Sequence, residues 1–168
     1  MNRIIIHCGE GRGKTSSAIG TLMRSIAHGK KVFAAQFFKP QTDSALEFIQ
    51  KNSPLITVKN YGSWYFIDKP DTRSAEVFNN AVDEIISILE NGDFDTILLD
   101  EIFYTVQFKL LDVQKIIDIM NRFDGKCFIL TGRYAPDELL KIADTVSRND
   151  CEKHAFDQGI KAQKGVEF

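Results

Sequence analysis

Short apolar runs alternate along the chain with longer stretches whose apolar residues recur at helical spacing. A run without polar residues is typical of a strand buried on both faces, whereas apolar residues at i, i+3 and i+4 indicate one face of a helix. The pattern predicts strands over residues 4–6, 32–38, 55–59, 96–99, 126–130 and 145–148. It predicts helices over residues 18–26, 44–51, 77–89, 113–120 and 136–143, and an aromatic, turn-rich loop over residues 60–71.

The alternation of strands and helices predicts the fold class. It favours an α/β fold in which helices cover both faces of a mostly parallel central sheet. In such sheets ligands bind beyond the carboxyl ends of the strands, and polar and aromatic residues follow the predicted strands at those ends. We therefore expect one domain over residues 1–168, with a functional site at this edge of the sheet.

A glycine-rich loop follows the first predicted strand. Residues 9–16, GEGRGKTS, contain three glycines that let backbone N–H groups turn toward one anion, and a helix begins directly after them. Lys14 adds a positive charge, and the Thr15 hydroxyl is a candidate Mg²⁺ ligand. Cys8 stands where the usual pattern has its first glycine, and we interpret it as a small residue filling a tight turn. This predicts a P-loop NTPase-like fold. The candidate ATP-binding residues are Gly9, Glu10, Gly11, Arg12, Gly13, Lys14, Thr15 and Ser16.

Two adjacent carboxylates end the fourth predicted strand. Asp100 and Glu101 follow an apolar run, which is the form of a Walker B element that reaches the nucleotide's metal ion. Side chains alternate along a strand, so the two cannot both point the same way if the strand continues. One of them then binds the metal or its water, and the other supports it. Alternatively, Glu101 is a general base that activates water, as in ATPases.

Composition narrows the class of protein. The net charge of −2 argues against a general nucleic-acid binder, because there is no basic surplus to neutralise phosphates. The three cysteines are far apart and form no C-x-x-C pair, which argues against a disulfide scaffold or a zinc knuckle. No apolar stretch approaches transmembrane length, and a strand-like run almost directly follows Met1. We therefore expect a cytoplasmic protein that does not bind membranes.

Four stretches together resemble one known family. They are GEGRGKTSSAIGTLMRSIAHGKKVFAAQFFK, LLDEIFY, ILTGRYAPDELLKIADTVS and KHAFDQGIKAQKG. They are similar to the P-loop type of ATP:corrinoid adenosyltransferase, also called cob(I)alamin adenosyltransferase, whose loop likewise lacks the first glycine. The resemblance covers nearly all of the chain, and its closing stretch is the most diagnostic part because other P-loop proteins do not carry it.

The resemblance implies adenosyl transfer from ATP. In this family Co(I) of a reduced corrinoid attacks the 5′ carbon of ATP, which is bound in reversed orientation, and triphosphate leaves. The family implies Lys14, Thr15, Glu101 and Trp64 as the catalytic residues. It implies Thr15 and Glu101 as ligands of Mg²⁺ or Mn²⁺, with Asp100 supporting them. The resemblance further implies that the corrinoid is cobalamin or a precursor, that the electron donor is a reduced flavoprotein, and that the protein is a homodimer.

The aromatic loop is where the chain departs from the family. A family Phe-x-Trp pair contacts the corrin and helps to displace its lower axial ligand. Trp64 matches the tryptophan, but Gly62 stands in the place of the phenylalanine, so we expect Phe66 or Tyr61 to fill that space. A hydrophobic lid or a dimer contact is the alternative interpretation of these aromatics.

Several further alternatives remain open. Arg133, after the fifth predicted strand, reaches either a phosphate or a corrin carboxamide, or else forms a surface ion pair. Longer family members carry a segment before the first strand, so we expect the corrinoid pocket here to be more open or completed by a partner subunit. The competing functions are a P-loop ATPase or kinase that uses Glu101 as a base and releases ADP, and a nucleotide- or corrinoid-binding protein without turnover.

Overall fold

The computed structural model describes residues 1–63 and 72–166, so Trp64 and Phe66 lie outside the described residues. One six-stranded sheet has the order β3-β2-β4-β5-β1-β6, and every pairing between its neighbouring strands is parallel. The strands are β1 (Arg3–Cys8), β2 (Val32–Phe37), β3 (Ile56–Tyr61), β4 (Thr96–Asp100), β5 (Cys127–Thr131) and β6 (Thr145–Arg148). The helices are α1 (Lys14–Ala27), α2 (Ser44–Asn52), α4 (Thr72–Asn91), α5 (Phe103–Gln107), α6 (Val113–Arg122), α7 (Asp137–Ile142) and the 3-10 helix η1 (Phe156–Gln158).

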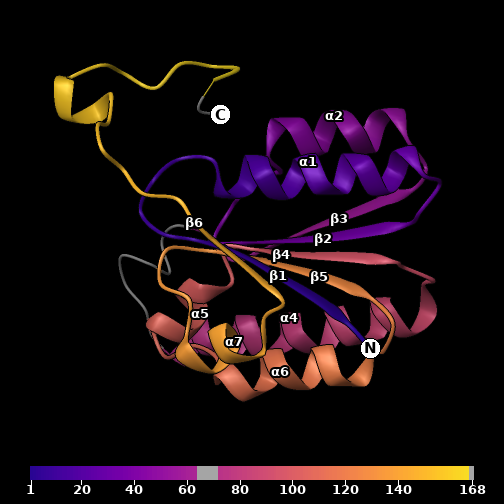
Figure 1. The fold of residues 1–168 in the computed structure, drawn as a ribbon. Helices are drawn as coiled ribbons and strands as arrows, with labels where there is room; N and C mark the ends of the chain where they lie inside the picture. The colour runs from indigo at the N-terminus through magenta and orange to yellow at the C-terminus, as the bar shows by residue number, and fades with distance from the viewer. Residues whose placement is uncertain (64–71, 167–168) are drawn as a thin grey trace.

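Helices cover both faces of the sheet, as the sequence predicts. Helices α1 and α2 lie on one face, and α4, α5, α6 and α7 lie on the other (Figure 1). Because side chains alternate along each strand, β2 gives Ala34 to the α1 face and Phe33 to the α4 face. All six residues of β2 and all five of β4 are buried, which is typical of central strands of a parallel sheet. The α/β fold with a mostly parallel sheet is confirmed.

The structure corrects the boundaries predicted for the aromatic region. The third strand was expected over 55–59 and the loop over 60–71, but β3 continues through Asn60 to Tyr61. The reason is packing: Tyr61 is only 7% exposed, and its ring centroid lies 5.7 Å from that of Phe37 on the neighbouring strand. Helix α5 was not predicted, because five residues are too few to show a helical repeat.

The strand order brings the candidate residues together. β5 lies between β1 and β4, so the carboxyl ends of β1, β5, β4 and β2 meet along one edge of the sheet. The glycine-rich loop follows β1 and leads directly into α1, while the acidic pair follows β4. Within the described ranges, no helix combines the length and the apolar character needed to cross a bilayer.

Candidate active site

The loop between β1 and α1 makes a tight turn around a buried cysteine. Cys8, the last residue of β1, is 1% exposed, so it is a small buried residue directly before the turn. Gly9 and Gly13 have φ values of 99° and 101°, a region that favours glycine. Gly13 comes directly before α1, so the turn aims the positive end of that helix at the site.

Neighbouring segments hold the loop before any ligand is bound. The Gly9 amide donates to the Arg133 carbonyl at 2.9 Å, and the Tyr134 hydroxyl donates to Glu10 Oε1 at 2.5 Å. Lys14 Nζ donates to the Gly11 carbonyl at 2.7 Å, which keeps the ammonium within the loop. Burial lowers the pKa of Lys14, and the negative charge of Glu101 opposes that shift. The loop therefore presents the Lys14 ammonium group, with which the phosphate of a bound nucleotide can pair.

Asp100 is the centre of a side-chain network at the end of β4. It is fully buried, and its Oδ1 accepts from the hydroxyls of Thr15 at 2.8 Å and Thr131 at 2.7 Å. Its Oδ2 accepts from Gln36 Nε2 at 3.0 Å and Lys39 Nζ at 2.7 Å. Burial alone would raise the pKa of Asp100, but Lys39 and these hydrogen bonds hold the pKa below its usual value. Asp100 is therefore an ionised, fully engaged carboxylate that fixes the Thr15 hydroxyl.

Glu101 follows Asp100 directly, but its carboxyl group differs from that of Asp100 in both its hydrogen bonding and its pKa. The strand ends at Asp100, and Glu101 turns away from it with φ 60°, while its amide donates to Thr131 Oγ1 at 2.9 Å. A non-glycine residue in this region carries strain of about 1–3 kcal/mol, which tends to persist at functional sites. Glu101 Oε2 is buried, and among the described residues it has no hydrogen-bond partner. Burial and the neighbouring charge of Asp100 raise the pKa of Glu101.

A buried carboxylate oxygen without a hydrogen-bond partner among the described residues fits a divalent cation. Such a cation would give Glu101 Oε2 the partner it lacks, and Mg²⁺ in nucleotide sites takes one or two carboxylates together with phosphate oxygens. Across residues 1–63 and 72–166, no group of three or more His, Cys, Asp or Glu side chains is placed to hold a metal alone. The donor set of Thr15 and Glu101 thus suits a cation that arrives with a nucleotide.

Three residues of this site were not assigned from the sequence. Gln36, Lys39 and Thr131 stand at strand ends, but only the fold shows that they share Asp100 as a partner. Gln36 is fully buried, and its Oε1 also accepts from the Asp43 amide at the start of α2. A glutamine inside the otherwise apolar run VFAAQF was the available signal, since a buried amide needs partners.

The predicted corrinoid residues are only partly described. Tyr61 belongs to the core beside Phe37, and its burial raises the pKa of its phenol. Arg133 is exposed just beyond β5, where its positive charge acts on Lys14 and Glu101. The structure therefore brings Arg133 to the edge of the site and places Tyr61 in the core at the end of β3, whereas Trp64 and Phe66 lie outside the described ranges.

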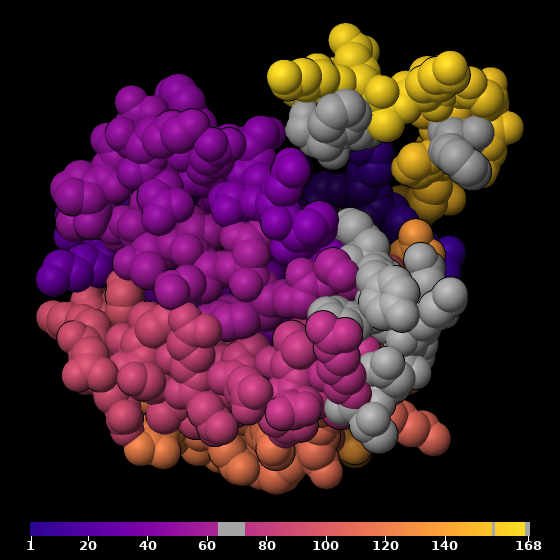
Figure 2. All heavy atoms as spheres, turned by 180° about the vertical axis from the view of Figure 1, so that it is seen from behind, coloured from indigo at the N-terminus to yellow at the C-terminus, as the bar shows by residue number. Residues whose placement is uncertain are grey.

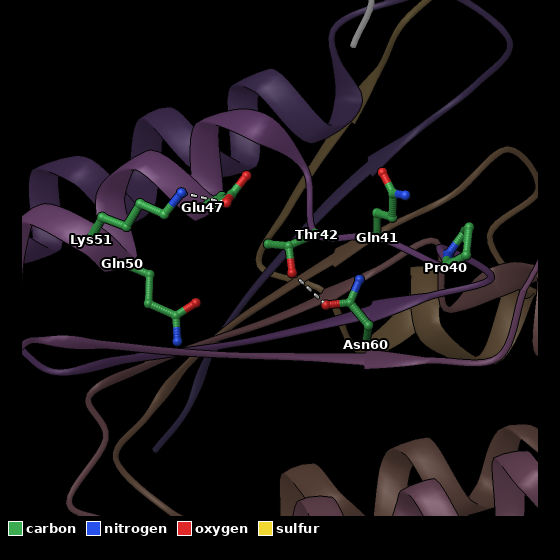
Figure 3. Close-up of a pocket in the computed structure, with 7 residues that line it drawn as sticks. All are labelled: Pro40, Gln41, Thr42, Glu47, Gln50, Lys51 and Asn60. Carbon is green, nitrogen blue, oxygen red and sulfur yellow. Dashed lines mark hydrogen bonds and ion pairs between the residues drawn. The ribbon is translucent and has the colours of Figure 1, made fainter.

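A cavity of about 610 Å³ lies beside this site rather than over the loop. Figure 3 shows its lining between α2 and the end of β3, with Thr42 Oγ1 donating to Asn60 Oδ1 at 2.8 Å. Asn60 Nδ2 donates to the Lys39 carbonyl at 3.3 Å, which connects the cavity wall to the Asp100 network. The lining residues are Pro40, Gln41, Thr42, Glu47, Gln50, Lys51 and Asn60. None belongs to the loop, so we place the nucleotide chemistry at the loop and not in this cavity.

Comparison with known proteins identifies the family. The family model described as ATP:corrinoid adenosyltransferase BtuR/CobO/CobP matches residues 1–168. The chain belongs to the ATP:corrinoid adenosyltransferase family. It is 34% identical over 172 residues to the corrinoid adenosyltransferase of Escherichia coli (strain K12), covering 98% of this chain and 85% of that one. It is 32% identical to corrinoid adenosyltransferases of Pseudomonas aeruginosa and Salmonella typhimurium, covering 98% of this chain and 83% and 85% of theirs.

A match of this extent favours an adenosyltransferase over the two other functions considered. It includes the closing third of the chain, beyond the loop and the acidic pair that P-loop ATPases and kinases share. The resemblance to the adenosyltransferase family is thus confirmed.

Proposed function

We propose that the chain transfers the 5′-deoxyadenosyl group of ATP to the Co(I) of a reduced corrinoid, either cobalamin or a precursor. The cobalt electron pair forms the bond to C5′, the C5′–O bond breaks, and its electron pair leaves with inorganic triphosphate. Cobalt is thereby oxidised formally from Co(I) to Co(III). The observation that carries the proposal is a phosphate loop beside an acidic pair, in a chain that the adenosyltransferase family model matches from residue 1 to 168.

The loop would act on the leaving group. Negative charge grows on the departing triphosphate, and preorganised positive groups stabilise such charge most strongly in the transition state. Lys14 and loop amides other than those of Gly9 and Gly11, which donate to protein carbonyls, are those groups. The segments that bond to Gly9 and Glu10 keep the loop in place. The cobalt nucleophile has no proton to lose, so Glu101 is not needed as a base.

Thr15 and Glu101 would hold a divalent cation, Mg²⁺ or Mn²⁺. When bound, the cation supplies positive charge to the phosphate oxygens. Asp100 would be a positioning residue, because its oxygens already accept four hydrogen bonds and one of these fixes the Thr15 hydroxyl. The unpartnered Glu101 Oε2 supports this division between the two carboxylates.

The corrinoid side of the proposal rests on the family resemblance. Trp64 and Phe66 would contact the corrin, and Arg133 would bind a phosphate or a corrin carboxamide. The burial of Tyr61 favours support of the following loop over direct contact with the corrin. We further propose a flavoprotein as the electron donor, a homodimer as the assembly, and one functional domain over residues 1–168.

The identity of the products tests the proposal. The protein is incubated without oxygen with ATP, Mg²⁺ and chemically reduced cobalamin, while the visible spectrum is followed and the phosphate product is identified. We expect the spectrum of a cobalt–carbon bond together with triphosphate. Release of ADP would indicate an ATPase or kinase instead, and ligand binding without a new cobalt–carbon bond would indicate a binding protein.

A further inference from the structure

The chain after β6 lies across the outer side of the phosphate loop. The Asn149 amide donates to the Cys8 carbonyl at 2.8 Å, and the Gly11 amide donates to the Asn149 carbonyl at 2.7 Å. The Asn149 side chain adds a third bond, from Nδ2 to the Arg12 carbonyl at 2.9 Å. Figure 1 shows this segment leaving β6 past the loop, and Figure 2 shows indigo atoms of the N-terminal part of the chain in a recess beneath the yellow C-terminal segment.

The approach is close enough to explain two of the loop glycines. A Cβ atom added to Gly9 would lie 2.5 Å from the Asn149 carbonyl oxygen, and one added to Gly11 would be in conflict with the Asp150 carbonyl oxygen. Real Cβ atoms make no such contacts. Glycine at these two positions is therefore required by this chain's own segment 149–150, whatever binds on the other side of the loop.

The side-chain bond of Asn149 fixes the plane of one peptide. In a trans peptide the carbonyl oxygen and the following N–H point in opposite directions. Because the Arg12 carbonyl points at Asn149, the Gly13 N–H points to the opposite side of the loop, away from segment 149–150. Gly13 comes directly before α1, where backbone N–H groups and the helix dipole favour an anion.

We propose that Asn149 is a positioning residue for the triphosphate of ATP. Its side-chain amide holds the Arg12–Gly13 peptide in the orientation that turns the Gly13 N–H toward the phosphates. This inference rests on the proposed function and adds to it a residue outside the glycine-rich loop. A loop set in its binding conformation before the ligand arrives binds more tightly, because less ordering remains to be done.

The test removes the side-chain bond and leaves the backbone bonds. Asn149→Leu keeps the size and shape of the side chain without its donor or any new charge. The matched control is Asn91→Leu, because Asn91 Nδ2 also donates to a backbone carbonyl, that of Ser87 at 2.7 Å, on the exposed end of α4. Calorimetry gives the Kd for Mg-ATP and for Mg-triphosphate, and steady-state kinetics give KM and kcat.

We expect Asn149→Leu to raise the Kd for ATP and for triphosphate alike, by about threefold to tenfold, as loss of one hydrogen bond allows. KM for ATP should rise similarly, and kcat at saturating ATP should fall as well, because the Gly13 N–H also faces the charge that grows on the leaving triphosphate. KM for the corrinoid should stay near that of the control. Both Kd values equal to those of Asn91→Leu would overturn the inference alone. Absence of ATP binding by the unaltered chain would overturn the proposed function as well. If the leucine variant does not fold, Asn149→Ala gives the same comparison.

Discussion

The end of β4 and the loop after β1 meet at one site but are held in place by different parts of the chain. Asp100 at the end of β4 is fixed by four side chains, which come from the first turn of α1, β2, the chain just beyond β2, and β5. Backbone amides and carbonyls of segments after β5 and β6 hold much of the loop. Side-chain anchors are lost by a single substitution, whereas backbone anchors survive most substitutions. The β4 end should therefore be sensitive at many positions and the loop at few.

The largest effect is expected for the one loop side chain that acts on the ligand. Lys14→Ala should lower kcat/KM by about 10²–10³, as loss of a group that stabilises developing charge does. The free energy of unfolding should change little, because within the described part of the chain Lys14 Nζ hydrogen-bonds to the Gly11 carbonyl of its own loop. Lys30→Ala is the control, since Lys30 is 55% exposed and pairs with Asp95 instead. Substantial turnover by Lys14→Ala would contradict the role of the loop.

Substitutions of Asp100 and Glu101 should have different effects on the free energy of unfolding. Asp100→Asn leaves the Lys39 ammonium without its buried partner and should cost about 3 kcal/mol of unfolding free energy, as expected for half of a broken buried pair. Glu101→Gln should cost almost nothing, since Glu101 Oε2 has no partner in the described residues and its charged form is disfavoured by burial. Urea unfolding measures both. Both variants should lose turnover, so similar losses of stability would remove the distinction between the carboxylates.

Backbone contacts make the loop sensitive at its glycines. Gly11→Ala forces a Cβ into the Asp150 carbonyl, and overpacking of this kind costs about 1–3 kcal/mol. Gly20→Ala in α1 is the matched control, because nothing lies within 4 Å of its added Cβ and alanine favours the helix by up to about 1 kcal/mol. The midpoint temperature of thermal unfolding should fall for Gly11→Ala and rise for Gly20→Ala. A Gly11→Ala protein as stable as the parent would show that segment 149–150 does not restrain the loop.

The parts of the site that could be predicted from the sequence are short, continuous segments of the chain. Residues 9–16 and the Asp100-Glu101 pair follow strands directly, so their strand-loop-helix context and their position at one sheet edge were predictable. The different roles of Asp100 and Glu101 were not predictable. Asp100 accepts hydrogen bonds from Gln36 and from residues 39 and 131, and only the strand order brings these together. Asn149 was missed for the same reason, since no residue near it in the sequence indicates that it contacts the glycine-rich loop. Tyr61 was assigned to a loop because its aromatic neighbours hid the strand pairing.

The smallest expected difference in unfolding free energy is between the loss of two hydroxyl groups three residues apart in the chain. Thr131 is fully buried, and its hydroxyl donates to Asp100 and accepts from the Glu101 amide. Tyr134 is 51% exposed, and its hydroxyl donates to Glu10 on a loop that backbone bonds already hold.

Thr131→Val leaves a buried acceptor and a buried donor with one partner fewer, which should cost about 2 kcal/mol of unfolding free energy. Tyr134→Phe removes a bond that water can replace, so about 0.5 kcal/mol and a change in KM for ATP of less than about twofold are expected. Urea unfolding and steady-state kinetics on both variants decide the matter. An equal loss at the exposed tyrosine would mean that side chains anchor the loop as they anchor the end of β4, and the contrast between the two regions would disappear.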